Sequence, residues 1–177
     1  MEENHIVGQI MITQEEIFSR AKEIGAQISQ DYAGETVLFI GILKGAVLWL
    51  ADVIKNITID TEIDFMAVSS YGASTKSSGV VRILKDLDRP IDEMHVIVVE
   101  DIIDSGITLN YLKGYLKARG PKSIKFCTLL DKPTGRRTEF KADYVGFEVE
   151  DKFIVGYGLD YDQRYRNLPY ISFLDEE

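Results

Sequence analysis

Two uninterrupted apolar segments constrain the fold more than any other feature of the chain. "TVLFIGI" covers residues 36–42, and "HVIVVED" opens with a similar run at residues 95–99. A strand that is apolar at every position is buried on both faces, as in a parallel sheet covered by helices on both sides. A sheet with one solvated face would alternate apolar and polar residues instead. The chain is therefore predicted to contain a central, mainly parallel sheet.

Segments with helical periodicity lie between the predicted strands. Ile17, Ala21, Ile24 and Ile28 recur at helical spacing, and Thr13, followed three residues later by a glutamate, gives a capping box. Alternating strands and helices predict an α/β fold with a twisted parallel sheet, right-handed crossovers and flanking helices. A further helix is predicted over residues 46–57, and another follows the turn after the second apolar strand and continues to about residue 119. Further strands are predicted over residues 60–69, 80–85, 123–132 and 142–149.

Composition narrows the class of protein. A chain of 177 residues suits one domain. Its net charge of −9 argues against tight nucleic-acid binding, but not against a small anionic substrate. No apolar run approaches the roughly 20 residues that span a bilayer, and the N-terminus lacks a signal-peptide core.

Cys127 has no partner for a disulfide, which fits a reducing cytoplasm, and is expected to be buried. His5 and His95 lie too far apart in sequence to suggest a zinc site.

Three carboxylates and a small polar turn follow the second apolar strand. Glu100, Asp101 and Asp104 precede the sequence Ser-Gly-Ile-Thr, which enters a helix. The free N–H groups and the dipole of a helix N-terminus bind phosphate, and carboxylate oxygens suit Mg²⁺. The alternatives are an ordinary helix capped by Asp104 or Ser105, and a solvated strand end. Together the features predict a sugar-phosphate site with Mg²⁺ close by.

The order of elements predicts where a ligand would bind. In open α/β sheets, ligands bind at the carboxyl ends of the strands, where the strand order reverses. The segments expected to converge there are residues 43–45, 100–108 and 129–132 and the aromatic tail, 151–170.

Five motifs in these segments resemble one enzyme family. "VVEDIIDSGITL" resembles the phosphoribosyl-pyrophosphate motif of purine phosphoribosyltransferases, and "GILKGA" their pyrophosphate loop. "SSYGAST" resembles their mobile loop, and "LLDKPTGR" and "DKFIVGYGLDYDQRYRNLPY" their purine-recognition and C-terminal segments. All five stand in the family's order between residues 36 and 170, which indicates the hypoxanthine-guanine branch.

The resemblance implies a fold, a reaction and partners. The fold would be the type I phosphoribosyltransferase fold in a single domain, 1–177, with a core over about 13–150 and a hood from about 1–12 and 151–177. The reaction would be purine salvage: Mg²⁺-dependent transfer from phosphoribosyl pyrophosphate to hypoxanthine or guanine. The protein would be a cytoplasmic homodimer or homotetramer with no membrane contact. The sequence does not rank hypoxanthine against guanine.

The resemblance also implies roles at the ribose and its phosphate. Glu100 and Asp101 would hold the ribose hydroxyls, directly or through Mg²⁺. Asp104 would be the acid/base at the purine N7 atom. The cradle of the 5′-phosphate would run from Asp104 through Ser105, Gly106, Ile107 and Thr108.

Other positions would serve the leaving group. Backbone amides of Lys44 and Gly45 would contact pyrophosphate, after a Leu43–Lys44 peptide that is often cis in this family. Asp160 would bind a second Mg²⁺, and Arg166 would clamp the pyrophosphate. Ser70 and Tyr71 would belong to a loop that closes over the site, from about residue 70 to 79.

The purine would be read by the remaining positions. Lys132 would donate to the 6-oxo group, Phe153 would stack on the ring, and the Ile154 backbone would read the ring edge. Lys152 would lie near purine and pyrophosphate. The alternatives are surface lysines for Lys44 and Lys132, and core packing for Phe153.

Two alternative functions stay open. One is another phosphoribosyltransferase, with xanthine the hardest base to exclude. The other is a regulatory protein of the same fold that senses phosphoribosyl pyrophosphate and binds nucleic acid. The acidic net charge and the set Asp104, Lys132 and Asp160 argue against the second.

Overall fold

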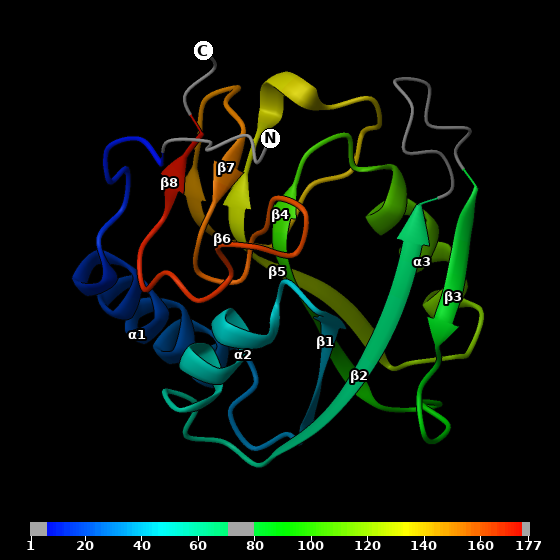
Figure 1. Ribbon diagram of the computed structural model, residues 1–177. Helices are drawn as coiled ribbons and strands as arrows, with labels where there is room; N and C mark the ends of the chain where they lie inside the picture. Colours follow the sequence, from blue (N-terminus) through cyan, green and yellow to red (C-terminus); the bar gives the residue numbers. More distant parts are fainter. Residues whose placement is uncertain (1–6, 71–79, 175–177) are drawn as a thin grey trace.

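The computed structural model describes residues 7–70 and 80–174, and shows a central sheet with helices on both faces (Figure 1). The six-stranded sheet has the order β3-β2-β1-β4-β5-β6. The helices are α1 (Gln14–Asp31), α2 (Val47–Ile54), α3 (Ile107–Lys117) and the 3₁₀ helix η1 (Pro133–Gly135). The strands are β1 (Val37–Leu43), β2 (Thr61–Ser70), β3 (Val81–Lys85), β4 (His95–Ile103), β5 (Ser123–Asp131), β6 (Tyr144–Glu148), β7 (Ile154–Val155) and β8 (Ser172–Phe173).

The sheet is parallel except at one edge, where β2 and β3 pair antiparallel. The chain runs from β1 to β2 through α2 on one side of β1, and from β4 to β5 through α3 on the other side. The strand order therefore reverses between β1 and β4. The carboxyl ends of these two neighbours form the point where ligands bind in such sheets, as the sequence predicts.

Both faces of the central strands are buried. In β1, Val37 and Phe39 pack in the cluster that contains the buried residues of α1 and α2, whereas Leu38 and Ile40 pack in the cluster that contains those of α3. The apolar run is thus explained by two cores, one on each face, which confirms the predicted fold class. Cys127 is fully buried, and burial raises the pKa of its thiol to about 12.

The first helix has the predicted start. The backbone N–H of Thr13 donates to Glu16 Oε2 at 2.7 Å, and the N–H of Glu16 donates to Thr13 Oγ1 at 3.2 Å, which completes the capping box. The second helix is shorter than predicted: it ends at Ile54, and the N–H groups of Asn56 and Ile57 make tighter turn bonds to Val53 and Ile54.

The two ends of the described chain lie together over the carboxyl edge of the sheet (Figure 1). Val7 and Ile12 pair with Leu174 and Ile171, and β7 pairs with β8. The aromatic tail, 151–170, therefore contains one short strand, β7, which pairs with β8 just beyond it. Residues 71–79, which hold Tyr71 and most of the predicted closing loop, lie outside the described residues.

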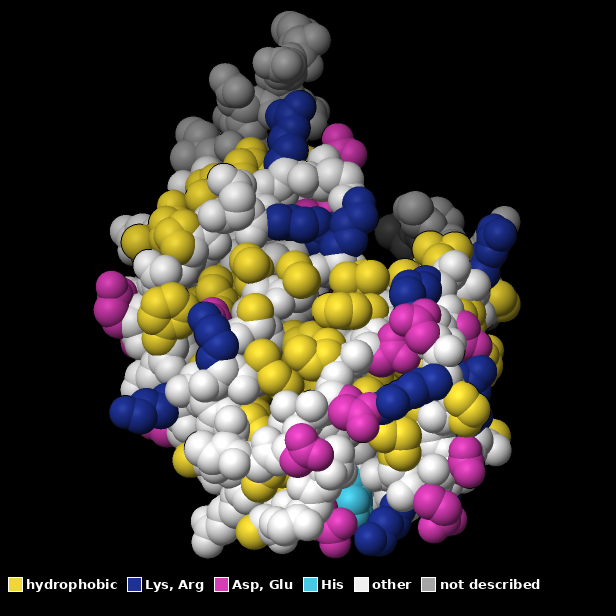
Figure 2. Space-filling view, turned by 90° about the horizontal axis from the view of Figure 1, so that it is seen from below, with side chains coloured by type: hydrophobic (Ala, Val, Ile, Leu, Met, Phe, Trp, Pro, Cys, Tyr) yellow, Lys and Arg dark blue, Asp and Glu magenta, His cyan; other side chains and the backbone are white. Residues whose placement is uncertain are grey.

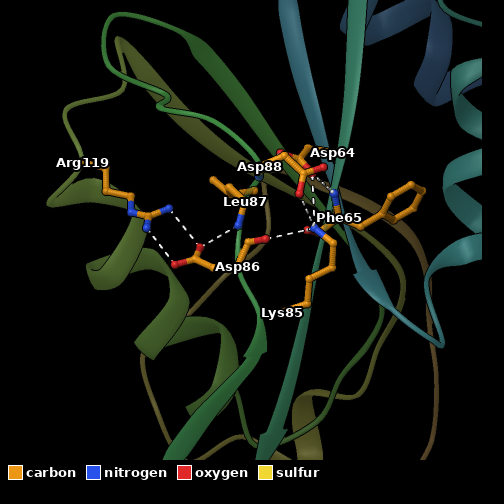
Figure 3. Close-up of polar contacts among 7 residues, drawn as sticks. All are labelled: Asp64, Phe65, Lys85, Asp86, Leu87, Asp88 and Arg119. Atoms are coloured by element: carbon orange, nitrogen blue, oxygen red, sulfur yellow. Dashed lines mark hydrogen bonds and ion pairs between the residues drawn. The ribbon is translucent and has the colours of Figure 1, made fainter.

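A polar cluster fixes the connection after β3, at the edge opposite the carboxyl ends (Figure 3). Asp86 receives hydrogen bonds from Arg119 at 3.0 and 2.8 Å, from Tyr115 Oη at 2.5 Å and from the N–H of Leu87 at 2.7 Å. Burial alone would raise the pKa of Asp86, but these bonds and the Arg119 charge outweigh it, so the pKa lies below its ordinary value. The cluster ties β3 to the end of α3.

None of the helices in the described part of the chain is long and apolar enough to span a membrane.

Candidate active site

The carboxyl ends of β1, β4 and β5 bring most of the predicted residues to one edge of the sheet. A cavity of about 160 Å³ lies at the end of β4 and the start of α3. Its lining includes all three predicted carboxylates and most of the predicted phosphate cradle; Ile107, the first residue of α3, is not part of it. The residues that line it are Glu100, Asp101, Ile102, Ile103, Asp104, Ser105, Gly106, Thr108 and Leu109.

The N-terminus of α3 carries no side-chain cap within the described structure. The residue before the helix is Gly106, in the left-handed region at φ 78°, which favours glycine. Ser105 Oγ accepts only a long bond, 3.3 Å, from the N–H of Ile107. The alternative in which Asp104 or Ser105 is an ordinary N-cap is therefore wrong. The uncapped N–H groups and the helix dipole provide a site for an anion.

The acidic pair at the end of β4 is held close together. The N–H of Asp101 donates to Glu100 Oε1 at 2.9 Å, and the N–H of Ile102 donates to Asp101 Oδ1 at 2.6 Å. Burial, followed by repulsion from Asp101, raises the pKa of Glu100 well above its ordinary value. Burial also raises the pKa of Asp101, against hydrogen bonds and the charge of Arg166. The pair is therefore suited to neutralisation by hydroxyl donors or a cation.

The turn after β1 lies against this acidic pair. The peptide between Leu43 and Lys44 is cis, which the sequence alone left open. A Cβ atom added at Gly45 would overlap the carboxylate of Asp101, and one added at Gly158 would overlap the carbonyl oxygen of Gly45. Glycine at both positions lets the turn, the acidic pair and the C-terminal segment approach one another.

A polar network joins this turn to the C-terminal segment. Gln163 Oε1 accepts from Lys44 Nζ at 3.1 Å and from Arg166 Nη2 at 3.2 Å. Asp160 pairs with Arg166 at 3.0 Å and accepts from the N–H of Gln163 at 2.8 Å. Arg166 Nε is buried and has no hydrogen-bond partner within the described structure. Sequence reasoning found Lys44, Asp160 and Arg166, but missed Gln163, which connects them.

Lys132 lies between two carboxylates. Its Nζ atom is 3.3 Å from Asp104 Oδ2 and 3.2 Å from Asp151 Oδ1, and its side chain is only 12% exposed. The backbone N–H of Lys132 donates to the carbonyl of Ile103 at 2.9 Å, which fixes the end of β5 beside the end of β4. Lys132 is therefore not a surface lysine. Asp151 opens the motif of residues 151–170, but sequence reasoning assigned it no role.

The aromatic and basic residues of the C-terminal segment take different positions. Phe153 is 53% exposed and meets Tyr161 edge to face at 5.4 Å, so its predicted alternative, core packing, is wrong. Ile154 is buried in β7. The ammonium of Lys152 lies 4.3 Å from the centre of the Phe173 ring. Ser70 is the last residue of β2.

Arg136 supports the loop after β5. Its Nε atom donates to the carbonyl of Asp104 at 3.1 Å, and its other nitrogens bind the carboxylate of Asp131 and the carbonyl of Phe140. A Cβ atom added at Gly135 would overlap Asp104 Oδ1. Arg136 thus holds this loop against the acidic turn. Arg136 is the last residue of the predicted purine-recognition segment, residues 129–136, but sequence reasoning assigned it no role of its own.

The geometry of this site agrees with the proteins of known family that the chain resembles in sequence and in structure. Residues 9–162 match the family model described as the phosphoribosyl transferase domain. A hypoxanthine-guanine phosphoribosyltransferase of Bacillus subtilis is 54% identical, covering 96% of this chain and 94% of that protein. One of Mycobacterium tuberculosis is 50% identical, covering 96% and 87%. A crystal structure of a Bacillus anthracis hypoxanthine-guanine phosphoribosyltransferase, with HEPES in its active site, superposes with a TM-score of 0.92 at 46% identity, covering 96% and 100%. The chain therefore belongs to the phosphoribosyltransferase family, in its hypoxanthine-guanine branch.

Proposed function

We propose that the chain acts in purine salvage, transferring the 5-phosphoribosyl group from phosphoribosyl pyrophosphate to hypoxanthine or guanine, with release of pyrophosphate. The products are IMP and GMP. The observation that carries this proposal is the pair of Lys132 and Asp104, 3.3 Å apart beside the uncapped start of α3. A donor for an oxo group and a proton-accepting carboxylate thus stand together next to a phosphate site.

The sugar phosphate is bound by the end of β4 and the start of α3. The 5′-phosphate lies on the N–H groups that follow Gly106, with hydroxyls of Ser105 and Thr108 beside it. The ribose hydroxyls face Glu100 and Asp101. Their contact supplies the neutralisation that two half-buried, adjacent carboxylates require.

The pyrophosphate leaves toward the turn after β1. Backbone amides of Lys44 and Gly45 face it, and the guanidinium of Arg166 clamps it. The hydrogen bonds of Gln163 support the role of these residues at the pyrophosphate, because they hold the ammonium of Lys44 and the guanidinium of Arg166 close together. Cations that stabilise a leaving phosphate lower the barrier to departure.

The carboxylates at the edge of the sheet fit magnesium. Glu100 and Asp101 would hold one ion with the ribose hydroxyls, and Asp160 would hold a second with pyrophosphate. No three His, Cys, Asp or Glu side chains among residues 7–70 and 80–174 gather into a metal site. One or two carboxylates per ion, together with substrate oxygens and water, are the usual ligands of Mg²⁺. When bound, Mg²⁺ neutralises the charge that develops on the pyrophosphate.

The base is read by Lys132 and by β7. Lys132 donates to the 6-oxo group; the 6-amino group of adenine is itself a donor and cannot accept this bond. Phe153, exposed beside the site, stacks on the ring, and the backbone of Ile154 reads its edge. Asp104 exchanges a proton with N7 as the bond to the sugar forms. Lys152 has a minor part here, because its ammonium is engaged by Phe173.

The two alternatives make different predictions. Xanthine differs from guanine only at position 2, so only a substrate comparison separates them. A nucleic-acid-binding regulator requires a basic surface, but the lysine and arginine side chains on the face in Figure 2 are interspersed with aspartate and glutamate. Enzymatic activity is therefore the better supported function.

The active form is proposed to be a homodimer or homotetramer in the cytoplasm. Helix α2 is apolar on nearly all sides, yet Val47 is 43% exposed; Ile63 in β2 and Leu84 in the edge strand β3 are 50% and 58% exposed. A helix that is apolar all round is normally buried, which supports contact with a second copy here. The unpaired, buried Cys127 fits a reducing compartment.

The test is an assay of pyrophosphate release with Mg²⁺ and phosphoribosyl pyrophosphate, one base at a time. Hypoxanthine and guanine are expected to release pyrophosphate and adenine is not. Equal release with xanthine would favour the first alternative. No release with any base, together with retention on nucleic acid, would favour the second.

A further inference from the structure

Asp151 contacts Lys132 and has no role in the proposed function, although it opens the motif of residues 151–170. Its Oδ1 atom is 3.2 Å from Lys132 Nζ, slightly closer than Asp104 Oδ2 at 3.3 Å. The lysine side chain is 12% exposed, whereas the Asp151 side chain is 70% exposed. One largely buried ammonium is thus held between two carboxylates, one from the end of β4 and one from the segment after β6.

The backbone places Asp151 at this position. The β5–β6 pairing ends with Asp131 beside Glu148, and the N–H of Val149 then donates to the carbonyl of Asp131 at 2.9 Å. A tight bend follows, closed by a 2.9 Å bond from the N–H of Lys152 to the carbonyl of Glu150. Lys132 follows Asp131 directly, so the anchored bend brings Asp151 over the lysine.

The hydrogen-bonding capacity of the lysine gives the second carboxylate a purpose. An ammonium has three donors and no acceptor. Its ion pairs with Asp104 and Asp151 hold it from two sides, and its N–H donors can still reach a ligand oxygen. In the proposed reaction Asp104 has to serve the purine N7, which weakens its hold on Lys132. Asp151 is then the carboxylate that still holds the ammonium.

We infer that Asp151 is a positioning residue for the reading of 6-oxopurines. It keeps Lys132 aimed at the 6-oxo group while Asp104 is engaged with N7, and it does not itself touch the substrate. This inference rests on the proposed function, because it assigns a partner to the lysine that reads the base.

The test compares Asp151→Asn with Glu150→Gln. Glu150 is the adjacent, exposed carboxylate, and within the described structure it makes no ion pair with Lys132. Both changes remove one negative charge from the same bend. The loss of an ion pair with one exposed partner corresponds to a roughly three- to fivefold loss of affinity. Asp151→Asn is therefore expected to raise KM for hypoxanthine about three- to fivefold, with KM for phosphoribosyl pyrophosphate unchanged. Glu150→Gln is expected to change neither.

A second measurement separates positioning from a general structural effect. IMP binding by titration calorimetry is compared for wild type, Asp151→Asn, Lys132→Ala and the double variant. If Asp151 acts through Lys132, Asp151→Asn weakens IMP binding in the wild-type background and has no effect in the Lys132→Ala background. Equal weakening in both backgrounds, or equal behaviour of Asp151→Asn and Glu150→Gln, would overturn the inference.

The outcomes also distinguish this inference from the proposed function. A wild-type protein that releases no pyrophosphate with either 6-oxopurine contradicts the function itself. A wild-type protein that is active, with an Asp151→Asn variant that matches it in KM for hypoxanthine and in IMP affinity, contradicts only the role of Asp151.

Discussion

Replacing Asp104 by Asn separates catalysis from structure at this site. The change keeps the size and hydrogen-bonding shape of the side chain but removes its charge. Asp104 is 55% exposed, does not cap α3, and within the described part of the chain makes one ion pair, with Lys132. A pair with one exposed partner contributes at most about 1 kcal/mol to the free energy of unfolding. The variant should therefore fold and melt almost as the wild type does.

The expected effect on the reaction is much larger. General acid–base catalysis contributes roughly 10²- to 10⁴-fold to the rate, which corresponds to about 3–5 kcal/mol of barrier. If Asp104 exchanges the N7 proton, Asp104→Asn lowers kcat for hypoxanthine at least about a hundredfold. KM for phosphoribosyl pyrophosphate should stay the same, because the 5′-phosphate binds the backbone of the turn.

The assay is steady-state IMP formation, with the melting temperature measured on the same samples. Asp92→Asn is the matched control, since Asp92 is an exposed aspartate at the opposite edge of the sheet, before β4. A kcat for Asp104→Asn within a few-fold of the control would refute the acid/base role. A large fall in melting temperature would instead show that Asp104 supports the fold.

Three further predictions address other parts of the molecule. Lys132→Ala should lower kcat/KM for hypoxanthine by roughly ten- to a hundredfold, the value of a charge-assisted hydrogen bond; unchanged kcat/KM would remove Lys132 from base reading. Asp160→Ala should raise the Mg²⁺ concentration for half-maximal rate, and full activity of the wild type in excess chelator would contradict any need for metal. Because the pKa of Asp86 is lowered, its ionised carboxylate stabilises the fold at pH values above 3.8, the ordinary pKa of aspartate. This stabilisation is lost as the pH falls through the lowered pKa. Asp86→Asn should thus cost about 1 kcal/mol of unfolding free energy at pH 7 and less near pH 3, measured by urea denaturation; a cost independent of pH would contradict this.

The arrangement of strands and helices could be predicted because each element carries its own local signal. The continuous apolar run of β1 indicates burial on both faces, and the Thr13–Glu16 capping box marks the start of α1. The ends of helices carry weaker local signals. Helix α2 ends at Ile54, where tight turn bonds replace helical ones, but no nearby Gly or Pro in the sequence marks this end.

The motifs contain the side chains of the site, but they do not show which of these side chains the fold brings into contact. Lys132 stands in one motif, and Asp151, 19 positions further along, opens another motif that follows a different strand. Gln163 meets Lys44 across more than a hundred residues. Neither contact has a period or spacing in the sequence, because both depend on the order in which strands meet at the carboxyl edge.

The central claim is that this edge of the sheet selects 6-oxopurines for transfer of a phosphoribosyl group. It is tested most directly by giving the protein an equimolar mixture of hypoxanthine, guanine and adenine with phosphoribosyl pyrophosphate and Mg²⁺, and identifying the nucleotides formed by chromatography and mass spectrometry. The structure predicts IMP and GMP, with no AMP. Formation of AMP at a comparable rate, or of no nucleotide at all, would contradict the account.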